Sequence, residues 1–431
     1  RSQQLNLEVF SMSLLRQAFM KFWNLELYWK VFIGMGAGII YALLMGEQAM
    51  NVAPLGDMFM RLLKMVIVPL IFFSITSGVS GIGENKSLGR LGAKTFGYYF
   101  LTSMLAILIG LTLTNVIQPG VGVDINAGGK DFDPSSLSQP GSLGNILIRM
   151  IPTNPIAAAA KGDVLSVIFF SIVLGMAITV LPEKQYKFMH ELFDTFFKVM
   201  MKMTQGVIMF LPIGVFGLIA KAVASTGFTL FKAVGWYMVT IASGLTIHIF
   251  IVLPIVFYLF TKINPMKHYK AIASAMATAF STSSSGATLP VTMDCIENRA
   301  GVSNKVTSFV LPLGATINMD GTALYECAGV LFISQALGFD LTVAQQLLIV
   351  ITAFLASVGA AAIPSAGLVM IFIVLDAVGL GDHPQAAIIV GTMLAVDRPL
   401  DMFRTVVNVT SDTMGAVIVA KSEGEEVLTK V

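Results

Sequence analysis

Long apolar stretches, separated by polar or glycine- and proline-rich sequence, run through most of this chain. Six of them are long enough, or nearly so, to cross about 30 Å of hydrocarbon as helices. The pattern therefore predicts six membrane-spanning helices before residue 262, at about 31–45, 58–81, 97–118, 164–181, 196–222 and 229–261.

After residue 262 polar clusters interrupt the apolar stretches. STSSSGATLP divides residues 268–298, and ASVGAAAIPSAG divides residues 341–376. A polar cluster facing lipid would leave backbone groups without hydrogen bonds, so both segments are predicted to be helical hairpins, the first entering and leaving on the cytoplasmic side. A seventh and an eighth span, about 303–335 and 385–419, follow the hairpins. Two interrupted hairpins, each followed by an interrupted helix, indicate an inverted repeat around a midplane binding site.

The eighth span contains the polar stretch DRPLDMFRTVVNVTSD, residues 397–412. Charge in hydrocarbon costs at least about 2.5–3.5 kcal/mol per residue, so such side chains are expected to line a pathway or a site. The alternative is a set of internal ion pairs that holds a helix bundle together. At 100° per residue the polar side chains share one helix face about 100° wide; they are Asp397, Asp401, Arg404, Thr405, Asn408 and Asp412.

Composition supports an integral membrane protein, because 55% of the 431 residues are hydrophobic and only 12% are charged, against about 25% charged in a soluble domain. The formal net charge of +2 argues against a nucleic-acid partner. The two cysteines, Cys295 and Cys327, form neither a metal-binding nor a disulfide pattern. No nucleophile–base pair or metal-ligand cluster is evident, so an enzyme is not expected.

The distribution of Lys and Arg predicts the orientation. These residues are concentrated before the first span and after the second, fourth and sixth spans, which places both chain ends in the cytoplasm. Residues 1–30 are expected to form a cytoplasmic segment whose residues 4–27 lie along the membrane surface as an amphipathic helix. Residues 421–431 are expected to form a charged cytoplasmic tail. The sequence thus predicts a multi-pass protein of the cell's inner (plasma) membrane.

Four motifs follow one another in the second half of the chain: STSSSGATLP, NMDGTALYE, VGAAAIPSAG and DRPLDMFRTVVNVTSD, at residues 281–290, 318–326, 358–367 and 397–412. In this order they resemble the dicarboxylate/amino acid:cation symporter family, which includes the archaeal aspartate and animal glutamate transporters. The resemblance extends from the first span to the eighth. It implies an all-α membrane protein with eight transmembrane helices, two re-entrant helical hairpins, inverted repeats and an elevator mechanism.

The same resemblance implies a division of the chain. Transmembrane helices 1, 2, 4 and 5, within residues 31–261, would form a scaffold and the interface of a homotrimer in the lipid bilayer. Helices 3 and 6 would move with a transport core at residues 262–420. The core would comprise hairpin 1 at about 268–298, helix 7 at about 303–335, hairpin 2 at about 341–376 and helix 8 at about 385–419.

Arg404 carries the prediction of substrate class. A guanidinium offers a bidentate fork that fits a carboxylate, although Asp397 or Asp401 is an alternative, internal partner. The resemblance implies that Arg404 holds the side-chain carboxylate of an acidic substrate and Asp401 its ammonium group. Half-helix ends at the hairpin tips also favour an anion. The implied substrate-binding residues are Ser283, Ser285, Thr322, Ile363, Gly367, Asp401, Arg404, Thr405 and Asn408.

Sodium is the expected co-transported ion, and no organic cofactor is expected. Gly321 is predicted to let the chain leave the helix, and freed carbonyl groups beside the Asp320 carboxylate suit a hard cation. The alternative is a hinge with a hydrogen-bonded, buried aspartate. The resemblance implies three sodium sites: Gly314, Asn318, Asn408 and Asp412; Thr316, Ser357 and Val358; and Tyr99, Thr102, Ser103, Asn318 and Asp320.

Two departures within the family bear on coupling. Ser283 stands where the archaeal aspartate transporters have an arginine. Glu326 stands where the sodium-only archaeal proteins have a glutamine, and a membrane-buried carboxyl group favours its neutral form. Glu326 is therefore a candidate for proton co-transport or potassium counter-transport, with a purely structural glutamic acid as the alternative.

The sequence thus predicts a sodium-coupled secondary active symporter that imports glutamate or aspartate. Two alternatives remain. One is a proton-coupled glutamate or dicarboxylate carrier, against which the intact sodium-site residues argue. The other is an anion channel, which would not need the pairing of Asp401 with Arg404.

Overall fold

The computed structural model describes most of the chain, and every regular element in that part is a helix. The predicted amphipathic segment before residue 25 and the tip of the second hairpin, with Ile363 and Pro364, lie outside the described residues. Those described are 25, 27–81, 89–123, 148, 151–161, 163–226, 229–359, 366–381, 383 and 385–429.

The first 261 residues contain helices at all six predicted apolar spans, and most of these helices begin earlier than predicted. The fifth span is two helices rather than one, because the chain bends by 53° between α8 and α9, where Pro212 occupies the first turn of the second helix. The elements are α2 Leu27–Met45, η1 Gly46–Val52, α3 Ala53–Ser80, α4 Gly89–Ile117, α6 Pro155–Lys161, α7 Val164–Thr179, α8 Glu183–Ile208, α9 Leu211–Thr226, α10 Thr229–Ile247, η5 His248–Val252 and α11 Leu253–Thr261.

The rest of the chain contains the two predicted hairpins as the packed pairs α12/α13 and α16/α17. The seventh span is broken between α14 and α15, as predicted. The elements are α12 Pro265–Thr282, α13 Ser285–Asp294, η6 Cys295–Arg299, α14 Asn304–Ile317, α15 Asp320–Ala336, α16 Val343–Gly359, α17 Ala366–Ala377 and α18 Ala386–Ser422.

The prediction of an interrupted eighth span is wrong, because α18 is a single helix of 37 residues. Several of its polar side chains bond to residues of neighbouring elements. The backbone N–H and C=O groups of α18 therefore keep their helical hydrogen bonds. Pro399 also lies inside this helix without ending it.

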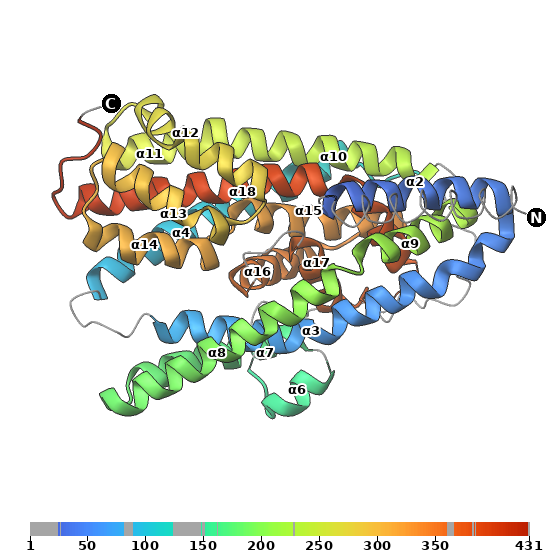
Figure 1. The fold of residues 1–431 in the computed structure, drawn as a ribbon, viewed down its shortest axis with the longest axis horizontal. Helices are drawn as coiled ribbons and strands as arrows, with labels where there is room; N and C mark the ends of the chain where they lie inside the picture. The colour runs from blue at the N-terminus through green and yellow to red at the C-terminus, as the bar shows by residue number, and fades with distance from the viewer. Residues whose placement is uncertain are drawn as a thin grey trace, which may run out of the picture.

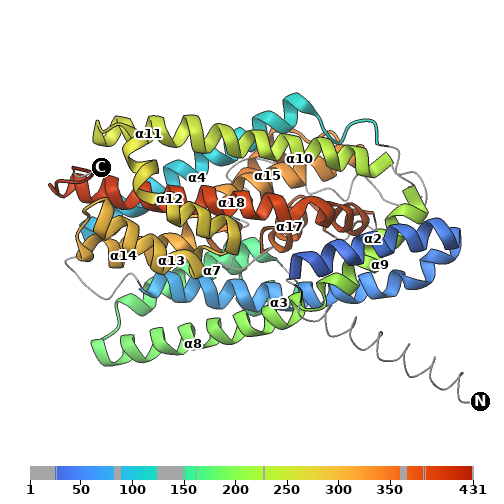
Figure 2. The ribbon, with the colours of Figure 1, turned by 45° about the horizontal axis from the view of Figure 1, so that its top comes forward.

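The helices fall into two groups. Helices α2, α3, α7, α8 and α9 pack mainly on one another, whereas α4, α10 and α12–α18 pack around α15 and α18. In both ribbon views, α3, α7 and α8 lie along the lower side and α10, α11 and α18 along the upper side (Figures 1 and 2). Helix α9 packs against both α3 and α18 and so joins the two groups.

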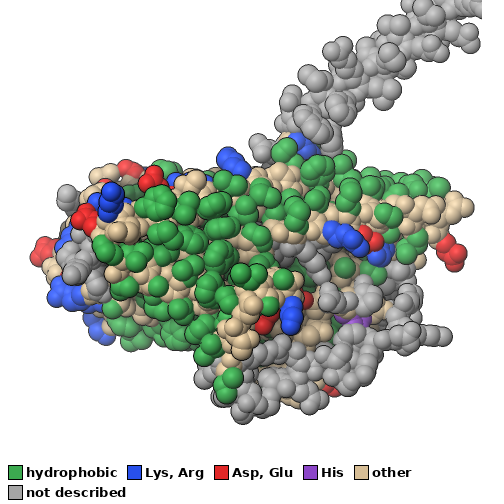
Figure 3. Space-filling model, turned by 90° about the horizontal axis from the view of Figure 1, so that it is seen from below, with side chains coloured by type: hydrophobic (Ala, Val, Ile, Leu, Met, Phe, Trp, Pro, Cys, Tyr) green, Lys and Arg blue, Asp and Glu red, His purple; other side chains and the backbone are tan. Residues whose placement is uncertain are grey.

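The surface has the apolar character expected next to lipid. Apolar side chains cover much of the described face in Figure 3, with many charged side chains toward its left-hand end. By length and composition, three described helices can cross a membrane, Trp29–Phe59, Arg90–Ile117 and Leu230–Thr261, or four if the bent pair of α8 and α9 counts as one. Helix α18 is not among them because of its charged side chains. The count of eight spans stays a prediction.

The segment after α18 folds back onto the ends of other helices. Glu423 pairs with Arg90 and, at 2.6 Å, with Lys94 of α4. These hydrogen bonds, first from Lys94 and then from Arg90, lower the pKa of the Glu423 carboxyl group. Glu425 accepts hydrogen bonds from the backbone N–H and the hydroxyl of Ser303 at 2.9 and 2.6 Å. The tail is thereby fixed to α4 and to the start of α14.

The contact between α4 and α15 depends on a glycine. A Cβ atom added at Gly110 would lie 2.8 Å from the carbonyl oxygen of Leu324, so Gly110→Val is expected to lower the free energy of unfolding by about 1–3 kcal/mol through overpacking. The measurement is thermal unfolding of the purified protein. Gly97→Val is the matched control, because Gly97 is on the same helix and has open space around it. Equal losses in both variants would show that helix propensity, not this contact, causes the effect.

Candidate functional site

A cluster of buried polar side chains lies where α14 ends, α15 begins, and α4 and α18 pass alongside. The helical backbone is lost at Asn318 (φ −92°, ψ 84°) and Met319 (φ −114°, ψ 60°). The break therefore comes before Gly321, and the prediction that Gly321 lets the chain leave the helix is wrong. Gly321 lies in the first turn of α15, where a Cβ atom would come within 2.8 Å of the Arg404 carbonyl oxygen. Its role is close packing of α15 on α18.

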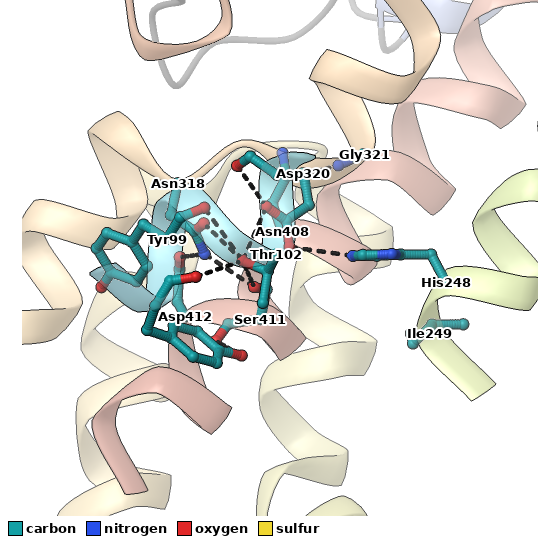
Figure 4. Close-up of polar contacts among 12 residues, drawn as sticks. Tyr99, Thr102, His248, Ile249, Asn318, Asp320, Gly321, Asn408, Ser411 and Asp412 are labelled. Carbon is teal, nitrogen blue, oxygen red and sulfur yellow. Dashed lines mark hydrogen bonds and ion pairs between the residues drawn. The ribbon is translucent and has the colours of Figure 1, made fainter. Parts of the chain in front are cut away.

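Asp320 is fully buried at the start of α15 and is held by side chains from two other helices (Figure 4). Ser103 and Thr102 of α4 donate hydroxyl hydrogen bonds to its Oδ1 at 2.6 and 3.3 Å. The Nε2 atom of His248 lies 3.1 Å from its Oδ2. A buried carboxylate is tolerated only when such partners replace water, so these contacts explain how Asp320 remains in the interior.

Asp412 of α18 is the second buried carboxylate near the break. Asn318 donates from Nδ2 to Asp412 Oδ1 and to Ser411 Oγ, both at 2.9 Å. A Cβ atom at Gly314 would lie 2.6 Å from Asp412 Oδ1 and 2.5 Å from the Tyr99 hydroxyl oxygen. The structure therefore brings together Tyr99, Thr102, Ser103, Gly314, Asn318, Asp320 and Asp412; that they bind sodium stays a prediction.

The charge around this break is unbalanced. Within the described part of the chain, no Lys or Arg pairs with Asp320 or Asp412; their hydrogen-bond partners are hydroxyl, amide and imidazole groups. Two buried carboxylates beside carbonyl and hydroxyl oxygens form the type of oxygen-rich, negative environment that hard cations prefer.

Arg404, on the same face of α18, lies in a different environment. Its Nη2 atom contacts Asp401 Oδ1 at 2.8 Å and Asp397 Oδ1 at 3.2 Å. Its guanidinium carbon stands 3.8 Å over the centre of the Tyr325 ring, and the Tyr325 hydroxyl donates to Asp397 at 3.0 Å. The internal ion pairs considered as an alternative therefore do form. They use only one nitrogen, however, because the buried Nε and Nη1 atoms have no hydrogen-bond partner among the described residues.

Other predicted substrate-binding residues lie close to this guanidinium. A Cβ atom at Gly367 would be 2.5 Å from Arg404 Nη1 and 3.2 Å from the Thr322 methyl group. Asn408 accepts a hydrogen bond from Gly321 N at 2.8 Å and approaches the Thr322 hydroxyl at 3.4 Å. Thr405 donates to the Asp401 carbonyl oxygen of its own helix at 2.8 Å.

The tip of the first hairpin is built as a pair of helix ends. Ser283 ends α12 with a left-handed φ of 50°, and its buried hydroxyl has no hydrogen-bond partner among the described residues. The Ser284 hydroxyl caps α13 by accepting from Ala287 N at 3.2 Å. Both helices pack on α18. In the described part of the chain, no hydrogen bond joins Ser283 or Ser285 to Arg404.

The residues of the second predicted sodium site are less closely connected. The hydroxyl groups of Thr316 and Ser357 each donate to carbonyl oxygens of their own helix, Leu313 at 2.9 Å and Phe354 at 2.8 Å. Helices α14 and α16, which carry them, pack against each other. Val358 is partly buried beside Ser357.

Glu326 lies one turn after Thr322 on α15 and is fully buried. Neither of its carboxyl oxygens has a hydrogen-bond partner among the described residues. Within the described part of the chain, a purely structural role for this carboxyl group thus has no hydrogen bond to support it, and the choice between the two roles stays open.

Three residues of this region were not predicted from the sequence: His248, Ser411 and Tyr325, whose aromatic ring lies under the Arg404 guanidinium. His248 carried a usable signal, because it is the only histidine in the apolar stretch 229–261, and an ionisable side chain inside a membrane span is a functional candidate by default. Ser411 and Tyr325 lie inside the motifs at residues 397–412 and 318–326, but serine and tyrosine are common in such helices, so residue type alone did not single them out.

Buried ionic clusters of this kind in an apolar, all-helical protein are typical of a membrane carrier for charged solutes. The chain belongs to the sodium:dicarboxylate symporter family, whose family model matches residues 27–422. The resemblance drawn from the four motifs is thus confirmed, and family membership places the chain among membrane transport proteins rather than enzymes.

The chain is similar to transporters from animals and bacteria. It is 37% identical to excitatory amino acid transporter 3 of Mus musculus over 423 residues, covering 86% of this chain and 79% of that protein. It is 33% identical to the proton/sodium-glutamate symport protein of Geobacillus stearothermophilus, over 93% of this chain and 96% of that protein. It is 32% identical to the proton/glutamate-aspartate symporter of Escherichia coli (strain K12), with 94% of each chain covered.

The stacking of Arg404 on Tyr325 gives a testable prediction. Tyr325→Leu is expected to lower the free energy of unfolding by about 0.5–2 kcal/mol more than Tyr325→Phe, the range for a cation over an aromatic face. Both variants lose the hydroxyl that binds Asp397, but only leucine removes the ring. Thermal unfolding of both proteins measures the difference. If the two variants are equally stable, the ring does not hold the guanidinium.

Proposed function

We propose that this protein is a sodium-coupled secondary active symporter that imports an acidic amino acid, glutamate or aspartate. The observation that carries the proposal is the buried Arg404 guanidinium, which lies 2.8 Å from Asp401 and keeps two nitrogen atoms, Nε and Nη1, without a partner among the described residues. A cation with spare donors beside a carboxylate suits a substrate that carries an ammonium group and an additional carboxylate. The names of the bacterial and animal relatives support this substrate class.

Substrate binding exchanges one set of ion pairs for another. The substrate's side-chain carboxylate binds Arg404, and its ammonium group binds Asp401, so neither buried charge loses its counter-charge when the Arg404–Asp401 pair opens. Thr322 and Asn408 supply neutral hydrogen bonds. Ser285, at the start of α13, receives the α-carboxylate, with the N–H groups of the helix end as donors.

Sodium binds at three sites formed by the residue sets that the family resemblance assigns. The ions neutralise Asp320 and Asp412, whose present partners among the described residues carry no fixed positive charge. Asn318 donates a hydrogen bond to Asp412, and the backbone N–H of Gly321, next to Asp320, donates one to Asn408. Asn408 lies one turn after Arg404 on α18, so these bonds connect the two carboxylates to the Arg404 region. Ion and substrate binding are thereby coupled, and the coupling is reciprocal by linkage.

Transport proceeds by an elevator movement of the α4, α10 and α12–α18 group against the α2, α3, α7, α8 and α9 group. The division of helix packing into these two groups supports this proposal. The two hairpins are re-entrant, the second is the extracellular gate, and eight helices span the bilayer with both chain ends in the cytoplasm. The protein works as a homotrimer in the inner (plasma) membrane.

Glu326 is the proposed site of proton co-transport or potassium counter-transport. Its full burial and the absence of a hydrogen-bond partner among the described residues favour a group that changes its proton or ion during the cycle. The bacterial relatives are named as proton/sodium-glutamate and proton/glutamate-aspartate symporters, which supports the same proposal.

Uptake into proteoliposomes tests the function. Radiolabelled glutamate and aspartate are offered with sodium, proton and potassium gradients imposed one at a time. We expect accumulation with an inward sodium gradient and none without sodium. Robust glutamate uptake driven by a pH gradient in sodium-free buffer would overturn the sodium coupling and favour a proton-coupled carrier. Currents without substrate accumulation would favour an anion channel.

Arg404 sets the substrate class in this proposal. Arg404→Cys is expected to weaken the uptake of glutamate and aspartate at least about tenfold, because hydrogen bonds to a charged group are worth about 1.5–3 kcal/mol, while small neutral amino acids gain access. Arg404→Lys keeps the charge without the fork and should fall in between. Concentration dependence of uptake for acidic and neutral amino acids measures both effects. Glutamate uptake at wild-type affinity in Arg404→Cys would refute the assignment.

A further inference from the structure

His248 is a fully buried histidine with no place in the predicted substrate or sodium sites, yet it contacts Asp320 directly. It comes from the junction of α10 and η5, and its Nε2 atom lies 3.1 Å from Asp320 Oδ2. In Figure 4 it approaches Asp320 from the side away from Asn318 and Asp412. The two oxygens of Asp320 are thus divided: Oδ1 receives the α4 hydroxyl groups, and Oδ2 faces the imidazole.

The backbone that begins at His248 is π-helical rather than α-helical. A π-helical turn, His248–Val252, begins at this residue, and the N–H of Leu253 bonds to the His248 carbonyl oxygen. The turn is also fixed from hairpin 1, since the Tyr269 hydroxyl donates to the Ile249 carbonyl oxygen. Pro254, two residues after the turn, lacks the N–H that a regular helix would use. Single π-turns inside α-helices occur frequently at functional sites.

The chemistry of the contact indicates the role of the imidazole. A neutral histidine has one N–H donor and one acceptor nitrogen. The Nδ1 atom has no hydrogen-bond partner among the described residues, whereas Nε2 faces a carboxylate oxygen. A proton on Nε2 therefore makes the hydrogen bond to Asp320, and the ring needs no positive charge to do so.

We propose that His248 is a positioning residue for sodium coupling: its Nε2–H holds Asp320 Oδ2 and so aims Oδ1, with Thr102 and Ser103, at the ion. This inference rests on the proposed sodium site at Asp320. Without the imidazole, the Asp320 carboxylate can rotate, and the ion loses a preorganised ligand. In the described part of the chain no hydrogen bond or ion pair joins His248 to Arg404 or Asp401, so the expected effect is on sodium binding rather than on binding of the amino acid.

The chain contains a matched control in His268. It is also fully buried, and its Nδ1 atom likewise lacks a hydrogen-bond partner among the described residues. Its Nε2 atom, however, lies 3.0 Å from the hydroxyl oxygen of Thr413 rather than from a carboxylate. Replacing it tests the general cost of removing a buried imidazole from this fold.

The experiment compares His248→Leu, His248→Gln and His268→Leu in proteoliposomes. The sodium concentration for half-maximal glutamate uptake is expected to rise about ten- to a hundredfold in His248→Leu, as for the loss of one hydrogen bond to a charged group. The glutamate affinity at saturating sodium stays near that of the parent protein. His248→Gln, whose amide N–H reaches a similar distance, restores the sodium dependence, and His268→Leu leaves it unchanged.

A second readout does not require transport. Sodium binding to the folded state raises the midpoint of thermal unfolding, and the sodium concentration that gives half of this rise should shift in His248→Leu as it does in uptake. If His248→Leu does not fold, His248→Asn replaces it, because its shorter amide does not reach Asp320 Oδ2. Either of two results would overturn the inference. One is a half-saturating sodium concentration in His248→Leu that is no higher than in His268→Leu, and the other is an equal rise in His248→Gln.

Asp320→Asn distinguishes a failure of this inference from a failure of the proposed sodium site at Asp320. If Asp320→Asn leaves the sodium dependence unchanged, the proposed sodium site itself is wrong. If Asp320→Asn shifts the dependence and His248→Leu does not, the sodium site stands and only the role of His248 is refuted.

Discussion

Charge inside an apolar helical protein must be compensated, and the rest of this structure depends on that constraint. The protein meets it in two ways. Around Arg404, a buried cation is balanced by Asp397 and Asp401 and stacked on Tyr325. Around Asp320 and Asp412, hydroxyl, amide and imidazole groups satisfy hydrogen bonds, and no Lys or Arg pairs with either carboxylate within the described residues. The first arrangement pairs opposite charges, whereas the second has the negative, oxygen-rich character on which the proposed sodium sites rest.

The two arrangements share the framework of α15 and α18. The break at Asn318 and Met319 brings the start of α15 to α18, and Gly321 permits that approach. Helix α15 then places Thr322 and Tyr325 near the Arg404 guanidinium. The two charged clusters are therefore held by one pair of helices, which is the structural basis of the coupling proposed above.

The sequence predicted the parts of this site that are local. The Ser-rich and Asn318–Glu326 motifs located the hairpin and the break, and helical periodicity placed the polar face of α18. The unbroken course of α18 could not be predicted, because it depends on partners that its side chains find on other helices. The contact of His248 with Asp320 joins residues 72 positions apart, and a lone histidine in an apolar stretch gives no helix register from which that contact would follow.

The docking of residues 423–428 has a practical consequence. Val427 and Leu428 are buried, and Leu428 N donates to the Ala300 carbonyl oxygen at 2.8 Å, so this segment is part of the folded body. A spectroscopic label placed in residues 423–428 would report the position of α4 and α14, to which the segment is bound. A purification tag attached there without a linker would instead compete with these contacts.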